Sequence, residues 1–202
     1  MYRAVSLTVA GMLLSACASE APNPTAPLAV PVFENATGKS PNANGGNFGT
    51  PLSSTEEVMP AGVTNDSIAR GSAIFQLNAA GTQLSYQLIV ANIENVFMAH
   101  IHRAPAGTNG GIVVWLHPST APGVMDPPGQ GRVDGVIATG TITGDDLVGA
   151  LAGQPLSALI TDLMNGNAYV NVHTNDGVAP TNTGPGDFPG GEIRGQVEHR
   201  GH

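Results

Sequence analysis

The sequence predicts an all-β fold, either a sandwich or a barrel. About seven segments have the hydropathy pattern of strands, and turn-forming Gly, Pro and Asn separate them. The chain after residue 50 has roughly the length of a single domain with one core. The predicted strands are residues 72–77, 83–90, 97–102, 112–116, 133–142, 168–174 and 192–199.

The first four strands are expected to form two hairpins. Apolar and polar side chains alternate from Leu84 to Val90, as they do in a strand with one buried face. The Ala80-Gly81 pair predicts a tight turn that joins this strand to the first one. The third and fourth strands predict a second pair.

A short helical insertion is expected after the fifth strand. Thr143 is typical of a helix N-cap, and Asp145 and Asp146 after it suit the first turn electrostatically. Pro155 then begins a second helical run over residues 156–164. The two remaining strands follow this insertion.

Histidines occur on two of the predicted strands. His100 and His102 lie two residues apart and therefore share one face, and His173 lies on one face of a later strand. If these strands are neighbours, three imidazoles can bind a divalent metal such as copper or zinc. In the alternative, the histidines hydrogen-bond to carbonyls of the long loops at residues 118–132 and 175–190 and hold those loops in place.

The histidine motifs carry a family resemblance. His100-Ile101-His102, then residues 169–174 (YVNVHT) and residues 191–196 (GEIRGQ), resemble the CHRD domain, a module named from chordin. The resemblance covers about residues 50–197. It implies a compact, immunoglobulin-like β-sandwich and does not define an activity. We expect the domain to act as a non-enzymatic binding module, with an envelope or extracellular ligand that the sequence does not identify.

A second resemblance concerns His117, which follows the strand at residues 112–116. Copper-zinc superoxide dismutases are similar β-sandwiches with an HxH pair, a further histidine after a loop and another on a late strand. The chain lacks the loop disulfide and the zinc cluster of that family. The comparison therefore implies at most a copper-only redox protein or copper carrier, with His117 as a fourth ligand to the metal.

Glu192 and Arg194 lie two apart on the final predicted strand. They suit a surface ion pair with neighbouring strands or loops, which contributes about 0–1 kcal/mol when exposed. In a metal centre, these residues are candidates for the groups around the ligands, and Glu192 can accept a hydrogen bond that orients His100 or His102.

The start of the chain predicts a lipoprotein. Arg3 and an apolar stretch precede Leu14-Ser15-Ala16-Cys17, which resembles a bacterial lipobox. Residues 1–17 are then a signal peptide, residues 18–49 a flexible tether rich in Pro, Asn and Gly, and residues 50–199 the domain. An acylated Cys17 would anchor the protein in the cell envelope, and the residues after it favour the outer membrane.

Composition and motifs exclude several function classes. The net charge is −8 and Lys39 is the only lysine, so we expect no nucleic-acid partner. No nucleophile elbow, phosphate loop or HExxH motif occurs, and we assign no catalytic residue. We expect an envelope-anchored binding module with a metal at His100, His102 and His173. A copper redox protein and a metal-free structural or adhesion domain are the alternatives.

Overall fold

The computed structural model describes residues 46–118 and 125–200. The predicted signal peptide, Cys17 and nearly all of the predicted tether lie outside the described residues. The strands are β1 (Asn47–Ser53), β2 (Arg70–Leu77), β3 (Leu84–Glu94), β4 (Val96–Arg103), β5 (Gly111–His117), β6 (Arg132–Ile142), β7 (Ala168–Thr174), β8 (Ile193–Gln196) and β9 (Glu198–His199). The helices are η1 (Ser54–Glu56), η2 (Gly144–Asp146), η3 (Gly149–Leu151) and α1 (Leu156–Met164). None of these helices is long and apolar enough to cross a bilayer.

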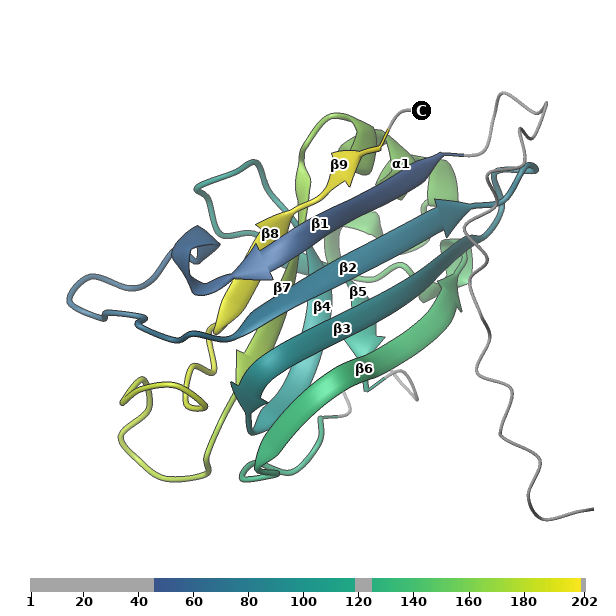
Figure 1. Ribbon diagram of the computed structural model, residues 1–202. Helices are drawn as coiled ribbons and strands as arrows, with labels where there is room; N and C mark the ends of the chain where they lie inside the picture. Colours follow the sequence, from purple (N-terminus) through teal and green to yellow (C-terminus); the bar gives the residue numbers. More distant parts are fainter. Residues whose placement is uncertain (1–45, 119–124, 201–202) are drawn as a thin grey trace, which may run out of the picture. The chain divides into compact units, whose positions relative to one another are not determined.

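The strands form one sheet in the order β5-β4-β7-β8-β1-β2-β3-β6, with β9 paired to β1. The sheet bends back on itself, so that β1, β2, β3 and β6 form a layer in front of β4, β5 and β7 (Figure 1). Tyr86 Oη donates a 2.8 Å hydrogen bond to the Leu116 carbonyl, which links β3 near one end of the sheet to β5 at the other. The predicted all-β fold with a short helix is confirmed, and both layers belong to one antiparallel sheet that nearly closes into a barrel.

One hydrophobic core stabilises the bent sheet. Phe75 and Leu88 from one layer, Ile101 and Val170 from the other, and Leu159 from α1 are all buried in the same apolar cluster. Each fully buried side chain of this size contributes about 1.5–3 kcal/mol. The core therefore fixes which face of each strand points inward.

Strand β7 is buried on both faces, from Ala168 to Thr174. Val170 and Val172 belong to the apolar core, so Asn171 and His173 point to the opposite face of the sheet. Polar side chains on that outer face are buried because loops cover them. The candidate site lies on this covered outer face.

The observed strands differ from the predicted ones mainly in β1 and in the last predicted strand, and β3 also continues past residue 90 to Glu94. Strand β1 begins at Asn47, before the predicted start of the domain at residue 50, and it pairs with β2 over its whole length. The sequence pattern does not predict this strand because it contains Gly49 and Pro51. Both residues are unfavourable in strands unless tertiary pairing supports them. The predicted strand at residues 192–199 is divided into β8 and β9 by Val197.

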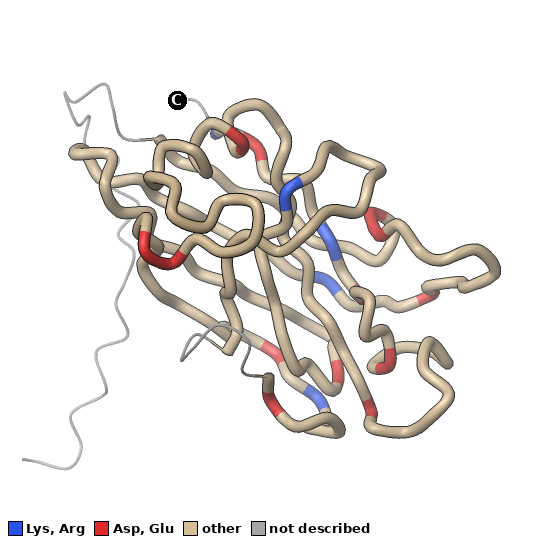
Figure 2. Tube along the Cα trace, turned by 180° about the vertical axis from the view of Figure 1, so that it is seen from behind, with Lys and Arg blue, Asp and Glu red and all other residues tan. Residues whose placement is uncertain are grey.

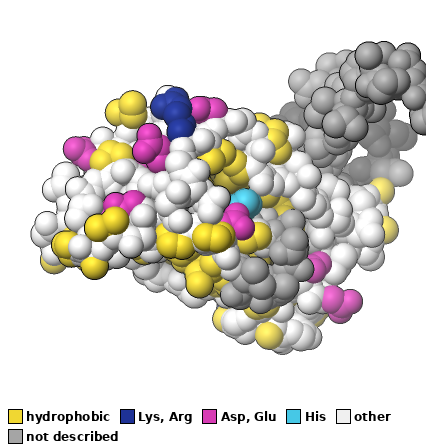
Figure 3. All heavy atoms as spheres, turned by 90° about the horizontal axis from the view of Figure 1, so that it is seen from below, with side chains coloured by type: hydrophobic (Ala, Val, Ile, Leu, Met, Phe, Trp, Pro, Cys, Tyr) yellow, Lys and Arg dark blue, Asp and Glu magenta, His cyan; other side chains and the backbone are white. Residues whose placement is uncertain are grey.

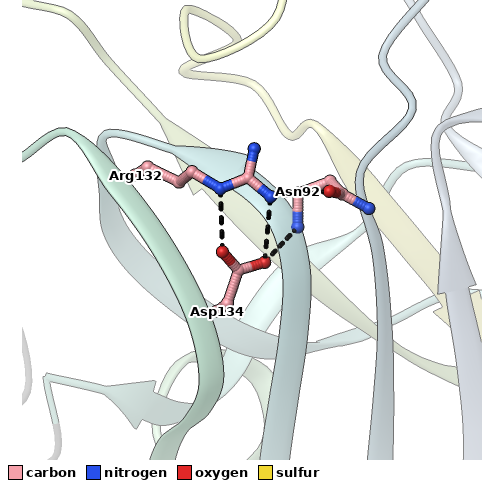
Figure 4. A network of polar contacts seen from close by, with 3 residues as sticks. All are labelled: Asn92, Arg132 and Asp134. Atoms are coloured by element: carbon pink, nitrogen blue, oxygen red, sulfur yellow. Dashed lines mark hydrogen bonds and ion pairs between the residues drawn. The ribbon is translucent and has the colours of Figure 1, made fainter.

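A polar network at the start of β6 accompanies an irregularity in its pairing with β3 (Figure 4). Asn92 has a left-handed backbone (φ 56°), and its amide donates a 2.7 Å hydrogen bond to Asp134 Oδ1. Arg132 Nε lies 2.8 Å from Asp134 Oδ2. These contacts lower the pKa of Asp134, first through the Asn92 amide and then through Arg132. They anchor the strand pair immediately before the chain turns into β4.

Candidate metal centre

The pairing of β4 with β7 assembles the three predicted histidines. The two strands are antiparallel neighbours, with His100 opposite Asn171 and Met98 opposite His173. Ile101 lies in the core, so His100 and His102 point outward, to the face that His173 also occupies. Period-two geometry and this register therefore bring together residues from two distant parts of the chain.

All three imidazoles are buried, and each offers a ligand atom within 4.8 Å of the other two. His100 Nδ1 lies 3.1 Å from His173 Nε2. The Nε2 atoms of His100 and His102 are buried without a hydrogen-bond partner among the described residues. Buried polar atoms usually have a partner, so these two nitrogens are available to a ligand.

Backbone carbonyls orient two of the three rings. His102 Nδ1 lies 2.9 Å from the Gly110 carbonyl, and His173 Nδ1 lies 2.9 Å from the Pro189 carbonyl. A carbonyl only accepts, so each Nδ1 carries the proton and each Nε2 is unprotonated. Metal-bound histidines are commonly held in this way. The same contacts attach the loops before β5 and before β8 to the histidines.

The site keeps its imidazoles neutral. Burial, together with the nearby His173 and His102, lowers the pKa of His100 from 6.5 to about 2. Burial and the nearby His102 lower the pKa of His173 to about 3, against the Pro189 carbonyl, which raises it. Burial also lowers the pKa of His102. Neutral imidazole is the form that binds metals, so protons do not compete for these nitrogens at neutral pH.

Arg194 supports His102 through an aromatic stack. The Cζ atom of Arg194 lies 3.4 Å from the centre of the Tyr169 ring. The His102 ring also stacks on Tyr169, with the ring centres 4.9 Å apart and an interplanar angle of 7°. Arg194 also donates hydrogen bonds to Thr108 O and Asn109 Oδ1 in the loop that carries the Gly110 carbonyl. Arg194 is thus part of the surroundings of the histidines, although it forms no ion pair within the described chain.

Glu192 has a different role from the predicted one. Its carboxylate is fully buried and accepts hydrogen bonds from Ser67 Oγ, Thr174 Oγ1 and the Gly186 amide. No histidine donates to it in the described part of the chain. Glu192 therefore ties the loop before β2 and the loop before β8 to the end of β7, and the backbone carbonyls orient the rings instead.

His117 is separated from the other three histidines. It lies opposite Ala99, which belongs to the core, so its side chain points to the other face of the sheet from His100. His117 Nε2 lies 2.9 Å from Asp126 Oδ2, and its Nδ1 lies 3.2 Å from the Ile137 carbonyl. The predicted four-histidine set is therefore not assembled.

Two neighbours of the cluster were not predicted from the sequence. Trp115, the only tryptophan, lies opposite His100 on β5, with the two ring centres 4.2 Å apart. Glu57 accepts a 3.3 Å hydrogen bond from Asn171, which lies between the histidines. Burial raises the pKa of Glu57 from 4.5 to about 8, although Arg194 lowers it. A single Glu in a loop has no local pattern that could have identified it.

The charges of the domain do not concentrate at this centre. Acidic positions are spread along the traced chain (Figure 2), and acidic side chains are dispersed among hydrophobic ones on the face shown in Figure 3. Arg103 and Arg132 are engaged with Asp162 and Asp134. Arg194, which stacks on Tyr169, is a basic residue that lies beside the histidines.

Comparison with known families matches residues 48–197 to the CHRD domain. This chain belongs to the CHRD domain family. The matched CHRD segment begins within β1 and contains all three clustered histidines. No curated protein and no solved structure matches the chain.

Proposed function

We propose that this CHRD domain is a non-enzymatic binding module that holds a transition-metal ion with His100, His102 and His173. The observation that carries the proposal is the burial of these imidazoles with two Nε2 atoms unpartnered and all ligand atoms within 4.8 Å. Three neutral nitrogens on two rigid strands suit copper or zinc and leave one coordination position open. The dispersed acidity of the domain would attract cations to its surface.

The location proposed for this module is the cell envelope. The support is the Leu14-Ser15-Ala16-Cys17 segment, in which Cys17 is the only cysteine of the chain. Acylation of Cys17 would attach the domain to the outer membrane through residues rich in Pro, Ala and Asn. The membrane is then one partner, and an envelope or extracellular ligand is the other.

Thermal unfolding of the tag-free protein with Zn²⁺, Ni²⁺ or Cu²⁺ at pH 7.5 tests the metal site. A metal that binds only the folded state raises stability by about 2.7 kcal/mol at a hundredfold excess over Kd. His102→Ala should remove most of that increment. His117→Ala, a matched histidine variant from the opposite face, should retain it. If none of these metals shifts the unfolding of the wild type, the proposal fails.

A second function is favoured by the contacts of His102 and His173 with the Gly110 and Pro189 carbonyls. In a metal-free structural or adhesion domain, these hydrogen bonds would serve only to hold the covering loops. The His102→Ala variant would then unfold at a lower temperature than the wild type, while added metal would change neither protein. The same titration therefore separates the two functions.

A further inference from the structure

The donor set of the centre carries no negative charge. It consists of three neutral imidazoles, and no carboxylate belongs to the cluster among the described residues. Glu192, the fully buried acid of the GEIRGQ segment, has its oxygens bound by Ser67, Thr174 and Gly186. The guanidinium of Arg194 lies one aromatic ring away from His102. The donor atoms therefore do not neutralise the charge of a bound cation, and the Glu57 carboxyl beside the cluster is hydrogen-bonded to Asn171 and is not a member of the donor set.

The charge of the ion then determines how much free energy its burial in this centre costs. The cost of moving an ion from water into a protein interior rises with the square of its charge and is large even for a monovalent ion. Burial in this centre consequently opposes a divalent ion far more strongly than a monovalent one. A monovalent ion with a preference for soft, neutral donors meets both conditions.

Met98 supplies such a donor beside the histidines. It lies directly opposite His173 in the pairing of β4 with β7, and two residues before His100 on β4. Directly opposite side chains in a sheet lie about 4.5–5.5 Å apart at Cβ. The Met98 thioether is thus on the histidine face and within side-chain reach of an ion bound there. Thioether ligands select Cu(I).

The geometry points to a Cu(I) site in which Met98 joins His100, His102 and His173. This inference rests on the proposed metal-binding function and adds the oxidation state and the fourth donor. Met98 is partly exposed, whereas the three histidines are buried. Because Met98 is on the histidine face and partly exposed, this side of the cluster is open to solvent.

Trp115 provides a local reporter for the test. It is the only tryptophan, and its ring lies against His100, so metal binding at His100 should change its fluorescence. Tag-free protein is titrated anaerobically with Cu(I) buffered by a competing chelator, with the redox-inert soft ion Ag(I), and with Zn²⁺. Wild-type protein should bind Cu(I) and Ag(I) more tightly than Zn²⁺.

Met98→Leu keeps the size of the side chain and removes the sulfur. It should weaken Cu(I) and Ag(I) binding at least about tenfold and change Zn²⁺ binding little. Met164→Leu, on the exposed end of α1, is the matched control and should bind all three ions like the wild type. Unfolding temperatures of the metal-free variants show whether Met98→Leu leaves the fold intact.

The outcomes separate this inference from the proposed function. Zn²⁺ binding that equals or exceeds Cu(I) binding, or a Met98→Leu variant that binds Cu(I) as tightly as the wild type, overturns the Cu(I) site but retains a histidine metal site. Absence of any change in Trp115 fluorescence and in unfolding temperature with all three ions overturns both.

Discussion

His100 Nδ1 lies 3.1 Å from His173 Nε2, which joins β4 to β7 through a buried imidazole pair. The Pro189 carbonyl accepts a hydrogen bond from His173 Nδ1, so His173 Nε2 accepts and His100 Nδ1 donates in this pair. The pair therefore has one hydrogen bond when both rings are neutral, and an additional proton on His100 Nε2 would have no hydrogen-bond acceptor among the described residues. A bound ion would compete with this hydrogen bond for the lone pair of His173 Nε2.

Acid should destabilise the metal-free domain through this pair. The pKa values of His100 and His173, about 2 and about 3, lie below 6.5, so the unfolded chain binds protons below pH 6.5 that the folded chain does not. Stability therefore falls as pH decreases from 6.5 toward 3, by about 1.4 kcal/mol per pH unit for each histidine. Denaturant unfolding at pH 7, 6, 5 and 4 measures this slope.

The contribution of one histidine can be isolated by substitution. His173→Asn should reduce the slope between pH 6 and 4 by about 1.4 kcal/mol per pH unit. His199→Asn, at an exposed position on β9, should leave the slope unchanged. Equal slopes for wild type and His173→Asn would show that His173 is not held neutral in the fold.

Glu57 should have the opposite pH dependence. Its pKa is raised to about 8, so between pH 4.5 and 8 the folded chain holds a proton that the unfolded chain releases. Stability therefore falls as pH rises through this range. Glu57→Gln imitates the protonated acid and should raise the free energy of unfolding at pH 8 by on the order of 1–3 kcal/mol, with no gain at pH 4. Glu56→Gln, at the exposed neighbouring residue, is the control, and a gain from it equal to that of Glu57→Gln would contradict the prediction.

Truncation should show where the domain begins. Phe48 and Leu52 on β1 are each 1% exposed and belong to the core. A chain that starts at residue 46 should unfold within about 3 °C of the longer protein, since a change of 1 kcal/mol corresponds to about 2–4 °C at this size. A chain that starts at residue 54 loses β1 and should unfold more than about 10 °C lower or fail to fold. Similar unfolding temperatures for both chains would refute the assignment of β1 to the core.

Lipidation is tested at Cys17. The wild type should fractionate with membranes and incorporate a fatty-acid analogue, because Cys17 follows the lipobox-like Leu14-Ser15-Ala16. Cys17→Ala should remove the label and leave the protein either unprocessed or released from membranes. Labelling that is equal in wild type and variant would exclude Cys17 as the acylated residue.

Local sequence patterns predicted the first and last residues of two elements correctly. The observed bounds of β7 and α1 equal the predicted ranges 168–174 and 156–164. Both segments have a clear period of their own, and α1 also has Pro155 before it and Asn165 after it. Strand β1 has no such local signal, because Gly49 and Pro51 are unfavourable in strands. Pairing with β2 and β8 accommodates both residues.

The surroundings of the histidines were less predictable. Glu192 and Arg194 both belong to the GEIRGQ motif, but Glu192 binds Ser67 and Thr174 whereas Arg194 stacks on Tyr169. His117 follows an apolar strand, as a ligand would, yet pairing with Ala99 directs it to the other face. Such differences depend on long-range packing and on the paths of loops, which leave no periodic pattern in the sequence.

By itself, the sequence determined the direction of each side chain along its strand. A period of two places His100 and His102 on one face whatever the strand contacts. Only the tertiary structure decided that β4 lies beside β7, which joins histidines 73 residues apart, and that loops cover this polar face. The reason is physical: strand direction follows from local backbone geometry, whereas sheet order and desolvation of the imidazoles depend on how the whole chain buries its apolar surface.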